Sequence, residues 1–361
     1  NNQVIDLGTL TELNPLDGQL PKSGPKIEAL SEYIGESPAF TFVIDTLFAD
    51  IKESRPFDST VPPQFLHTHN GYTDPTATAR ALINELNSLP CKYLVSLELP
   101  DEISAELKPI AGPYEISDQI KLVTPDAVSI ATLPLTSGIQ LRDASLFGGG
   151  TLLAPPGDRQ WPHGKVHLQM EIQGFIGRLL STSTEERIIS TIRSLIGLGI
   201  ASRMLQIRSI PRSLGLFGMG VPISNYLIVH KWTDAHWQMW KTIALPDYVN
   251  EIINRIEPDE GYSRLNSAGK ATWTRDSLAQ IVTAFRNLKK ARLVILAAKW
   301  LLDSYSGKNH LLNFVQATTA LEIMLGGGKK DLLSIGEMIG NRSAYLISKS
   351  QSEREEVMRT M

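Results

Sequence analysis

Hydrophobic residues recur at helical spacing through the last quarter of the chain. From Arg275 to Tyr305, apolar residues return every seventh position with others beside them, as on the buried stripe of a long helix. No Gly or Pro interrupts this run before Gly307, where a helix is expected to stop. The pattern predicts one helix over 275–305, with a stripe made of Ile281, Leu288, Ile295 and Leu302, flanked by Leu278, Phe285, Val294 and Leu301.

Two further helices are predicted after this one. The second runs from about Lys308 to Leu325 and ends at three consecutive glycines, 326–328. At 100° per residue its apolar side chains fall in one arc, which we take as its inward face. That arc comprises Leu311, Phe314, Val315, Leu321 and Leu325. The third helix begins near Asp331, which suits an N-cap position, and its apolar arc comprises Leu332, Ile335, Met338, Ile339 and Leu346.

One charged residue lies within each of these two apolar arcs. Glu322 falls between Leu311 and Val315 on the second helix, and Arg342 lies in the middle of the arc on the third. Buried charges are normally retained only when they are paired. One interpretation is therefore a buried Glu322–Arg342 pair that stabilises the fold. The other is that both groups border an active groove.

The sequence of these helices resembles the HEPN domain family, particularly its ApeA-like branch. The run LLNFVQATTALEIML at 311–325 is similar to the "ALE-x-L-L" helix of that branch, and IGNRSAYLI at 339–347 is similar to its "x-R-x-A-x-L-L" helix. The acidic helix start at 352–356 also fits. The resemblance covers about the last quarter of the chain and implies an all-α HEPN-like helical bundle. Many HEPN proteins are metal-independent ribonucleases that act as dimers.

The catalytic signature of that family, an Arg followed after four to six residues by a His, does not occur in this chain. Arg159 and His163 are too close together, and we expect the signature just beyond Met361, so that the domain is truncated here. In the family mechanism the RNA 2′-hydroxyl attacks the phosphodiester, a His provides acid–base catalysis and an Arg stabilises the phosphorane. The catalytic residues are therefore unknown, with Glu322 and Arg342 as supporting candidates, and whether the chain is an enzyme stays open.

The exposed side of the 275–305 helix is basic. Arg286, Lys289, Lys290 and Arg292 are the candidate RNA-binding residues, because their charge suits a phosphate backbone. The alternative is that they form an ordinary solvated helix face. The chain of 361 residues has a net charge of −3, so a surface for nucleic acid has to be local.

Upstream of residue 257 the hydrophobic pattern is mixed. Alternation at 92–99 and 166–176 predicts strands, and helical spacing at 74–88 and 183–205 predicts helices. We therefore expect an α+β region with a mixed or antiparallel sheet, followed by the helical bundle. The first 40 residues, rich in Pro, Gly, Asn and Ser, are predicted to form an ordered arm or loop and not a helix or strand. The apolar run at 39–51 is compatible with a strand or a short helix.

Gly- and Pro-rich segments suggest where the chain divides. The segment 137–164 contains three consecutive glycines and two Pro-rich turns, and 257–271 is polar. We expect an N-terminal α+β region at 1–136, a second α+β subdomain at 137–256 and a HEPN-like helical domain at 257–361. The second subdomain contains glycine-rich loops and the run 230–241, whose three tryptophans and two histidines suit either base stacking or core packing.

Other candidate chemistry is limited. His67 and His69 are spaced so that both can bind a metal from a strand end, but no partner set recurs downstream, and ordinary loop histidines are the alternative. A single cysteine, Cys91, excludes an intramolecular disulfide and suits the cytoplasm. We predict no metal, no cofactor and no membrane span.

The function we expect is that of a HEPN-type metal-independent endoribonuclease in anti-phage defence or toxin-like growth arrest. The N-terminal region would act as sensor or regulator. The expected partners are RNA, further copies in a homodimer or higher homo-oligomer, and a phage-derived or protein trigger. One alternative is a non-catalytic HEPN-like module that binds RNA, a nucleotide or another protein. A metal hydrolase using His67 and His69 is the third.

Overall fold

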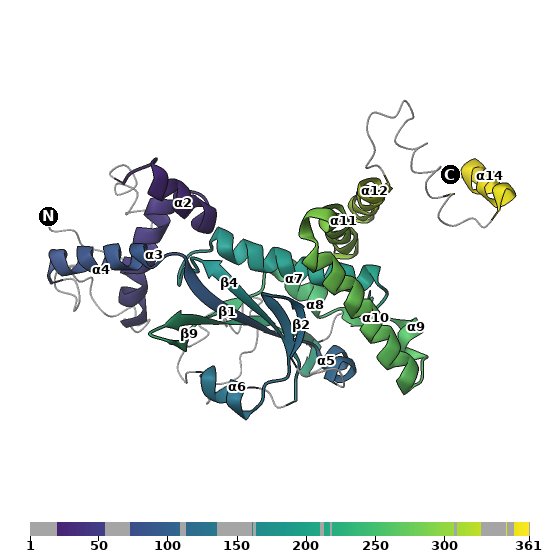
Figure 1. The fold of residues 1–361 in the computed structure, drawn as a ribbon, viewed down its shortest axis with the longest axis horizontal. Coiled ribbons are helices and arrows are strands. Elements are labelled where there is room, and N and C mark those ends of the chain that lie inside the picture. Colours follow the sequence, from purple (N-terminus) through teal and green to yellow (C-terminus); the bar gives the residue numbers. More distant parts are fainter. Residues whose placement is uncertain are drawn as a thin grey trace.

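The fold is mixed α/β, with an antiparallel sheet upstream of helices in the C-terminal part (Figure 1). The computed structural model describes residues 20–54, 73–108, 113–135, 161, 164–209, 213–216, 219–306, 309–325, 344 and 350–360. Among these residues no helix is long and apolar enough to cross a membrane. The predicted third C-terminal helix, from Asp331, lies outside them.

Six strands form the central sheet in the order β2-β3-β4-β1-β8-β9, and every neighbouring pair is antiparallel. These strands are β1 (Cys91–Glu98), β2 (Tyr114–Ser117), β3 (Ile120–Val123), β4 (His167–Gly174), β8 (Tyr226–Thr233) and β9 (His236–Ala244). Two small antiparallel pairs add β5 (Leu205–Ile207) with β10 (Ile256–Pro258), and β6 (Ser213–Leu216) with β7 (Met219–Pro222). The predicted strands at 92–99 and 166–176 are confirmed as β1 and β4.

The sheet takes strands from both of the regions predicted upstream of residue 257. β1, β2 and β3 come from 1–136, whereas β4, β8 and β9 come from 137–256. β4 pairs with β3 on one side and with β1 on the other. Strands on both sides of the predicted boundary therefore form one sheet.

Three helices precede the sheet in sequence and gather at one end of it in Figure 1: α2 (Pro25–Ile34), α3 (Pro38–Ser54) and α4 (Pro75–Asn87). The arm or loop predicted for the first 40 residues is thus wrong over α2, and the undecided run at 39–51 is helical. Each of these helices begins with Pro, whose fixed φ suits the first helical turn. A residue that indicated a loop in the sequence therefore starts a helix here. The helix predicted over 74–88 is confirmed as α4, and Asp74 is its N-cap, with a carboxylate that accepts a hydrogen bond from Thr76 N at 2.8 Å.

The remaining helices are α5 (Asp101–Leu107), α6 (Ala127–Thr132), α7 (Ser183–Ala201), α8 (Asp247–Ile253), α9 (Glu260–Ser263), α10 (Ser267–Arg286), α11 (Leu288–Ser306), α12 (His310–Leu325) and α14 (Gln351–Thr360). The prediction of a single helix over 275–305 is wrong. The helix is interrupted at Asn287, which has non-helical backbone angles of φ −119° and ψ 45°. Its side-chain amide donates to Thr283 O, and its carbonyl accepts the first hydrogen bonds of α11. Asn is well suited to end a helix in this way.

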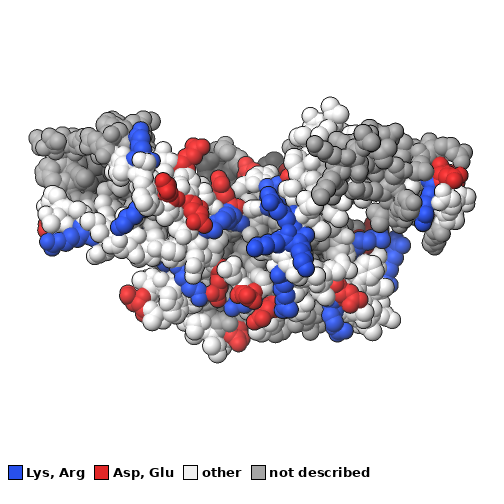
Figure 2. Space-filling model, turned by 45° about the horizontal axis from the view of Figure 1, so that its top comes forward, with Lys and Arg blue, Asp and Glu red and all other residues white. Residues whose placement is uncertain are grey.

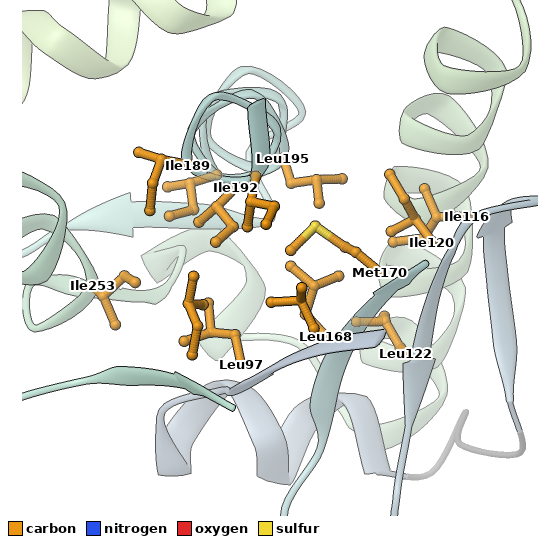
Figure 3. Packing of buried hydrophobic residues seen from close by; sticks show 14 of the residues in the cluster. Leu97, Ile116, Ile120, Leu122, Leu168, Met170, Ile189, Ile192, Leu195 and Ile253 are labelled. Carbon is orange, nitrogen blue, oxygen red and sulfur yellow. The ribbon is translucent and has the colours of Figure 1, made fainter. Parts of the chain in front are cut away.

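α7 covers one face of the sheet and builds the main core with it (Figure 3). Its Ile192 and Leu195 point toward Leu168 and Met170 on β4, and all four are buried. α11 packs on the other side of α7 at very close range. A Cβ built on Gly197 of α7 would lie 2.3 Å from the carbonyl oxygen of Ala298, so glycine is what permits this approach.

The face of the sheet opposite α7, called the second face below, is covered by other residues. Leu133 and Trp161 pack there against Leu94 of β1, with α6 on the same side of the sheet in Figure 1. The indole N–H of Trp161 donates to Leu133 O at 2.8 Å, which fixes the ring over the sheet. Several buried polar side chains lie beneath this cover.

Candidate functional site

The predicted RNA-binding residues lie together at the junction of α10 and α11. Arg286 ends α10, whereas Lys289, Lys290 and Arg292 belong to the first turns of α11. All four side chains are exposed, and none forms an ion pair with an acid in the described part of the chain. The structure therefore leaves these four cations available to solvent. Figure 2 shows one group of Lys and Arg side chains near the centre of the face that it displays.

The start of α11 is electrostatically unusual. The N-terminus of a helix carries a partial positive charge and normally attracts Asp or Glu. The first turn of α11 contains no acid and instead contains Lys289 and Lys290. The cations and the helix end thus add to one local positive potential, which suits an anion such as a phosphate group. Asp303, an acid near the other end of α11, pairs with Arg193 of α7.

The predicted supporting residues are not brought together by the described structure. Glu322 is exposed on α12, so its carboxylate does not lie in the interior, as the buried-pair interpretation required. Arg342 lies outside the described residues. The alternative interpretation, in which Glu322 and Arg342 border an active groove, remains a prediction.

The apolar arc of α12 is not an inward face. Leu311 is 72% exposed and Phe314 65% exposed, and Val315 and Leu321 are also exposed. On α12 the buried side chain is that of Ala320. The neighbouring helix α11 likewise exposes large apolar side chains, at Leu288, Leu293, Val294 and Leu296. Large exposed apolar surfaces of this kind are typical of sites that contact another molecule.

The Trp- and His-rich run at 230–241 is a β-hairpin formed by β8 and β9. Asp234 and Ala235 make its turn, both with positive φ, of 49° and 64°. Trp232 and Trp237 pair edge to face beside this turn, with Trp232 43% exposed. The tryptophans of this run therefore lie in two different places. Trp240 is further down the hairpin, where its indole N–H donates a hydrogen bond to Ile176 O at 2.8 Å.

A buried ionic cluster next to Trp240 joins the N-terminal helices to the sheet. Asp45 of α3 is 2% exposed and accepts hydrogen bonds from three consecutive backbone N–H groups, those of residues 178–180, at 2.6–3.0 Å. Lys241 of β9 pairs with Glu185 of α7 at 2.6 Å and also donates to Gly177 O. Burial raises the pKa of Glu185, and Lys241 opposes that shift. These contacts are internally satisfied, so we interpret the cluster as structural.

On the second face of the sheet, three buried polar side chains contain atoms that have no hydrogen-bond partner. Ser96 of β1, His167 of β4 and His230 of β8 are each 0% exposed. The Ser96 hydroxyl, both ring nitrogens of His167 and Nδ1 of His230 have no hydrogen-bond partner, although Nε2 of His230 lies 3.1 Å from Pro134 O. Leaving a buried polar atom unpaired costs roughly 1–3 kcal/mol. Such groups are rare in folded proteins and call for an explanation.

The strand register brings these residues together on one face. Ser96 lies opposite Ile228 on β8, His167 lies opposite Glu98 on β1, and His230 lies opposite Leu94 on β1. Since side chains two residues apart share a face, Ser96 sits diagonally between the two histidines. Sequence reasoning missed this group, because alternating polar residues in a strand are typical of a solvated face.

Burial favours the neutral form of both histidines. Burial, together with the nearby charge of Lys165, lowers the pKa of His167 to about 4. Burial also lowers the pKa of His230, while the contact with Pro134 O opposes the shift. A neutral imidazole offers one donor and one acceptor. Trp161 lies against both rings, edge-on to His167 at 5.0 Å and nearly parallel to His230 at 6.0 Å between ring centroids.

A polar pocket opens beside this group, where β1 ends and β8 begins. It has a volume of about 360 Å³ and is lined by Glu98, Asp101, Glu102, Asn225, Tyr226, Ile228 and Asn254, among others. Hydrogen bonds hold its wall in place: the Asn225 side chain donates to Asn250 at 2.8 Å and to Asn254 at 3.0 Å. Burial raises the pKa of Glu98, and Lys165 opposes this. Its three carboxylates are paired with cations, Glu98 and Asp101 with Lys165 and Glu102 with Arg208, so the pocket is polar without a free excess of negative charge.

The predicted metal pair, His67 and His69, lies outside the described residues. Within those that are described, no group of three His, Cys, Asp or Glu side chains is arranged to hold a metal ion. Comparison of the chain with family models, curated proteins and solved structures found no significant match. The sequence and the geometry above therefore carry the functional argument alone.

Proposed function

We propose that this protein acts on RNA through its C-terminal helices, as a HEPN-type metal-independent endoribonuclease. The observation that carries the proposal is the group of four exposed, unpaired cations at the junction of α10 and α11. Its position at a helix N-terminus without acidic residues favours a phosphate backbone over a solvated face. The helix predicted from the "ALE-x-L-L" resemblance also coincides with α12. Assembly into a homodimer or higher homo-oligomer belongs to the same proposal.

The second candidate is a non-catalytic HEPN-like module that binds RNA or another protein. The exposed apolar side chains of α11 and α12 favour it, because they suit a protein partner as well as a second copy. A role in anti-phage defence or growth arrest, with the sheet region as sensor and a phage-derived or protein trigger, would follow from the nuclease. A cytoplasmic location is part of the same proposal.

The test is a salt-dependent titration of labelled single-stranded RNA, followed by a cleavage assay with EDTA present. Replacing Lys289 and Lys290 by Ala should weaken binding and reduce the slope of log K against log salt by up to about 1.4, since each phosphate contact on a single strand contributes roughly 0.7. The matched control removes two exposed charges elsewhere, by Lys26→Ala and Arg80→Ala. This control should bind RNA like the unmodified protein.

The outcomes separate the candidates. Cleavage in EDTA supports the ribonuclease, and RNA binding without cleavage supports the non-catalytic module. Cleavage that requires added metal contradicts the HEPN mechanism. If the Lys289/Lys290 variant and the Lys26/Arg80 control bind RNA equally, the junction of α10 and α11 is not the RNA-binding surface.

A further inference from the structure

We propose that this protein binds a slender aliphatic alcohol, with the hydrocarbon chain in an apolar cavity between α7 and the sheet and the hydroxyl head in the polar pocket where β1 ends and β8 begins. The two spaces share three lining residues, Leu97, Leu99 and Pro100. The inference goes beyond the action on RNA proposed for the C-terminal helices and does not depend on it. The exposed cations at the junction of α10 and α11 line neither space.

The apolar cavity lies inside the main core, between the sheet and the helices α5, α7, α8 and α10. Its volume is about 70 Å³, several times the roughly 10–15 Å³ that one water molecule requires. Every side chain that lines it is Leu, Ile, Met or Pro, and in Figure 3 Leu97, Leu168 and Ile192 of this lining point toward one another. Protein cores seldom leave a space of this size, and an apolar one stays dry and accepts an apolar guest.

The size of the cavity favours a flexible hydrocarbon chain over a ring. An apolar cavity that accepts benzene measures roughly 150 Å³. The cavity here has about half that volume. A straight alkyl chain is narrower than a ring and adapts its torsions to an irregular aliphatic wall. The cavity is therefore suited to the end of an alkyl chain, whose remaining carbons extend toward the polar pocket.

The passage between the two spaces lies where β1 leads into α5. Leu99 and Pro100 line both spaces and are partly exposed, whereas Leu97, the third shared residue, is 2% exposed. Leu99 directly follows β1, and Pro100 is the N-cap of α5. A chain that enters from the polar pocket therefore passes the connection between β1 and α5 and leaves the paired strands in place.

The charges of the polar pocket favour an uncharged head. Glu98 and Asp101 pair with Lys165, and Glu102 pairs with Arg208. A carboxylate or an ammonium group on the ligand would add a charge without a partner to a site that is already balanced and partly shielded from water. A neutral group that forms hydrogen bonds does not carry this cost.

The other polar groups of the pocket suit a hydroxyl head. Ser224 and Tyr226 line the pocket, and their hydroxyl groups both donate and accept hydrogen bonds. The wall beside them is already ordered, because the Asn225 side chain donates to Asn254 at 3.0 Å and Asn254 donates to Ile223 O at 2.6 Å. Binding therefore needs little reorganisation of this wall.

The test is calorimetric titration of the whole chain with the straight-chain alcohols from 1-butanol to 1-decanol. We expect saturable 1:1 binding in which each added CH₂ tightens Kd by roughly fourfold until the cavity is full, after which Kd no longer improves. Hexanoate and hexylammonium have the same chain length as 1-hexanol but a charged head. Each should bind at least about tenfold more weakly than 1-hexanol.

Two variants locate the site. Leu99→Phe places a ring in the wall that the two spaces share and should weaken alcohol binding by about tenfold or more. Its matched control is Leu82→Phe, at a partly exposed leucine of α4 that lines neither space, which should bind like the unmodified protein. Ile103→Val removes one carbon from the cavity lining, so the affinity should improve up to a chain about one carbon longer, even if Leu99→Phe fails to fold.

The proposal is overturned if no alcohol binds, if the affinity does not depend on chain length, or if a charged head binds more tightly than the hydroxyl. It is also overturned if Leu99→Phe and Ile103→Val both bind the alcohols exactly as the unmodified protein does, because the alcohols would then bind elsewhere on the chain.

Discussion

His167 makes the second face of the sheet sensitive to acid. Its imidazole is fully buried without a hydrogen-bond partner, and its pKa falls from the usual 6.5 to about 4. Between these two values the unfolded chain binds a proton that the folded chain does not. Stability is therefore lost as the pH falls through this window. The difference, 6.5 − 4, corresponds to about 3 kcal/mol.

Replacing His167 by Leu should remove this acid sensitivity. We expect the variant's advantage in free energy of unfolding to grow by about 3 kcal/mol between pH 7 and pH 4, because Leu does not titrate. Urea denaturation at several pH values measures this difference. Ser96→Ala, on the same face but without a titratable group, is the control and should differ from the unmodified protein by a constant amount. A His167→Leu difference that does not change with pH would contradict the assignment.

Residues whose role is local could be predicted from the sequence, whereas residues that depend on distant partners could not. The helix predicted over 74–88 is present as α4, where Asp74 and Pro75, neighbours in the sequence, form its start. Ser96 and His167 looked like the solvated positions of two strands, but both are buried on the face of the sheet where Leu133 and Trp161 pack. Asp45 in the middle of an apolar run gave no sign that it binds a backbone loop more than 130 residues away.

Helix and strand periodicity located most elements but missed their ends where no Gly or Pro marks them. The apolar repeat continues across Asn287, so α10 and α11 read as one helix in the sequence. The hairpin of β8 and β9 was hidden in the same way, because its turn uses Asp234 and Ala235 in left-handed conformations without a glycine. The close contact of α7 with α11 could not be predicted from the sequence, where its one sign is the glycine at position 197.

Replacing Gly197 by Ala should separate α7 from α11. The new Cβ would lie 2.3 Å from the backbone carbonyl oxygen of Ala298, which no side-chain rotation can relieve. We expect a loss of about 2 kcal/mol or more in free energy of unfolding, even though Ala favours the helix by about 1 kcal/mol. Chemical denaturation measures this loss.

Gly199→Ala is the matched control, since it lies on the same helix and changes intrinsic propensity equally. Its Cβ would meet the end of the Leu205 side chain at 2.7 Å, which can move aside. The control should therefore cost clearly less than Gly197→Ala. Equal costs for the two variants would show that the backbone contact between α7 and α11 does not limit stability.

At the scale of the whole molecule, the sequence predicted the class of the fold but not how its parts combine. The structure contains the predicted mixture of helices and strands in the first part of the chain and the predicted helices in the last part. The pairing of β4 with β1 joins segments separated by about 70 residues, and no local pattern specifies such a pair. The HEPN-like bundle itself stays a proposal, because it also involves residues outside those described.

The apolar side chains of α11 and α12 bear on the assembly of the whole protein. Leu311 and Phe314 are large apolar residues with highly exposed side chains. A monomeric protein rarely leaves a continuous apolar surface of this kind in contact with water. α11 lies against α12, and both present such residues, so a second copy related by two-fold symmetry could cover both helices at once. The proposed homodimer therefore has a definite interface to test.

We predict that the chain has twice its monomer mass of 39.8 kDa in solution and that Leu311→Gln with Phe314→Gln returns it to one chain. The two substitutions put polar amides into the centre of the interface, where they would lose their hydration without gaining partners. Size-exclusion chromatography with light scattering measures the mass at micromolar concentration. Ile83→Gln with Val128→Gln removes equally exposed apolar residues from α4 and α6 and should leave the dimer intact. A single-chain mass for the unmodified protein would leave the apolar surface to a different protein partner, as the non-catalytic alternative requires.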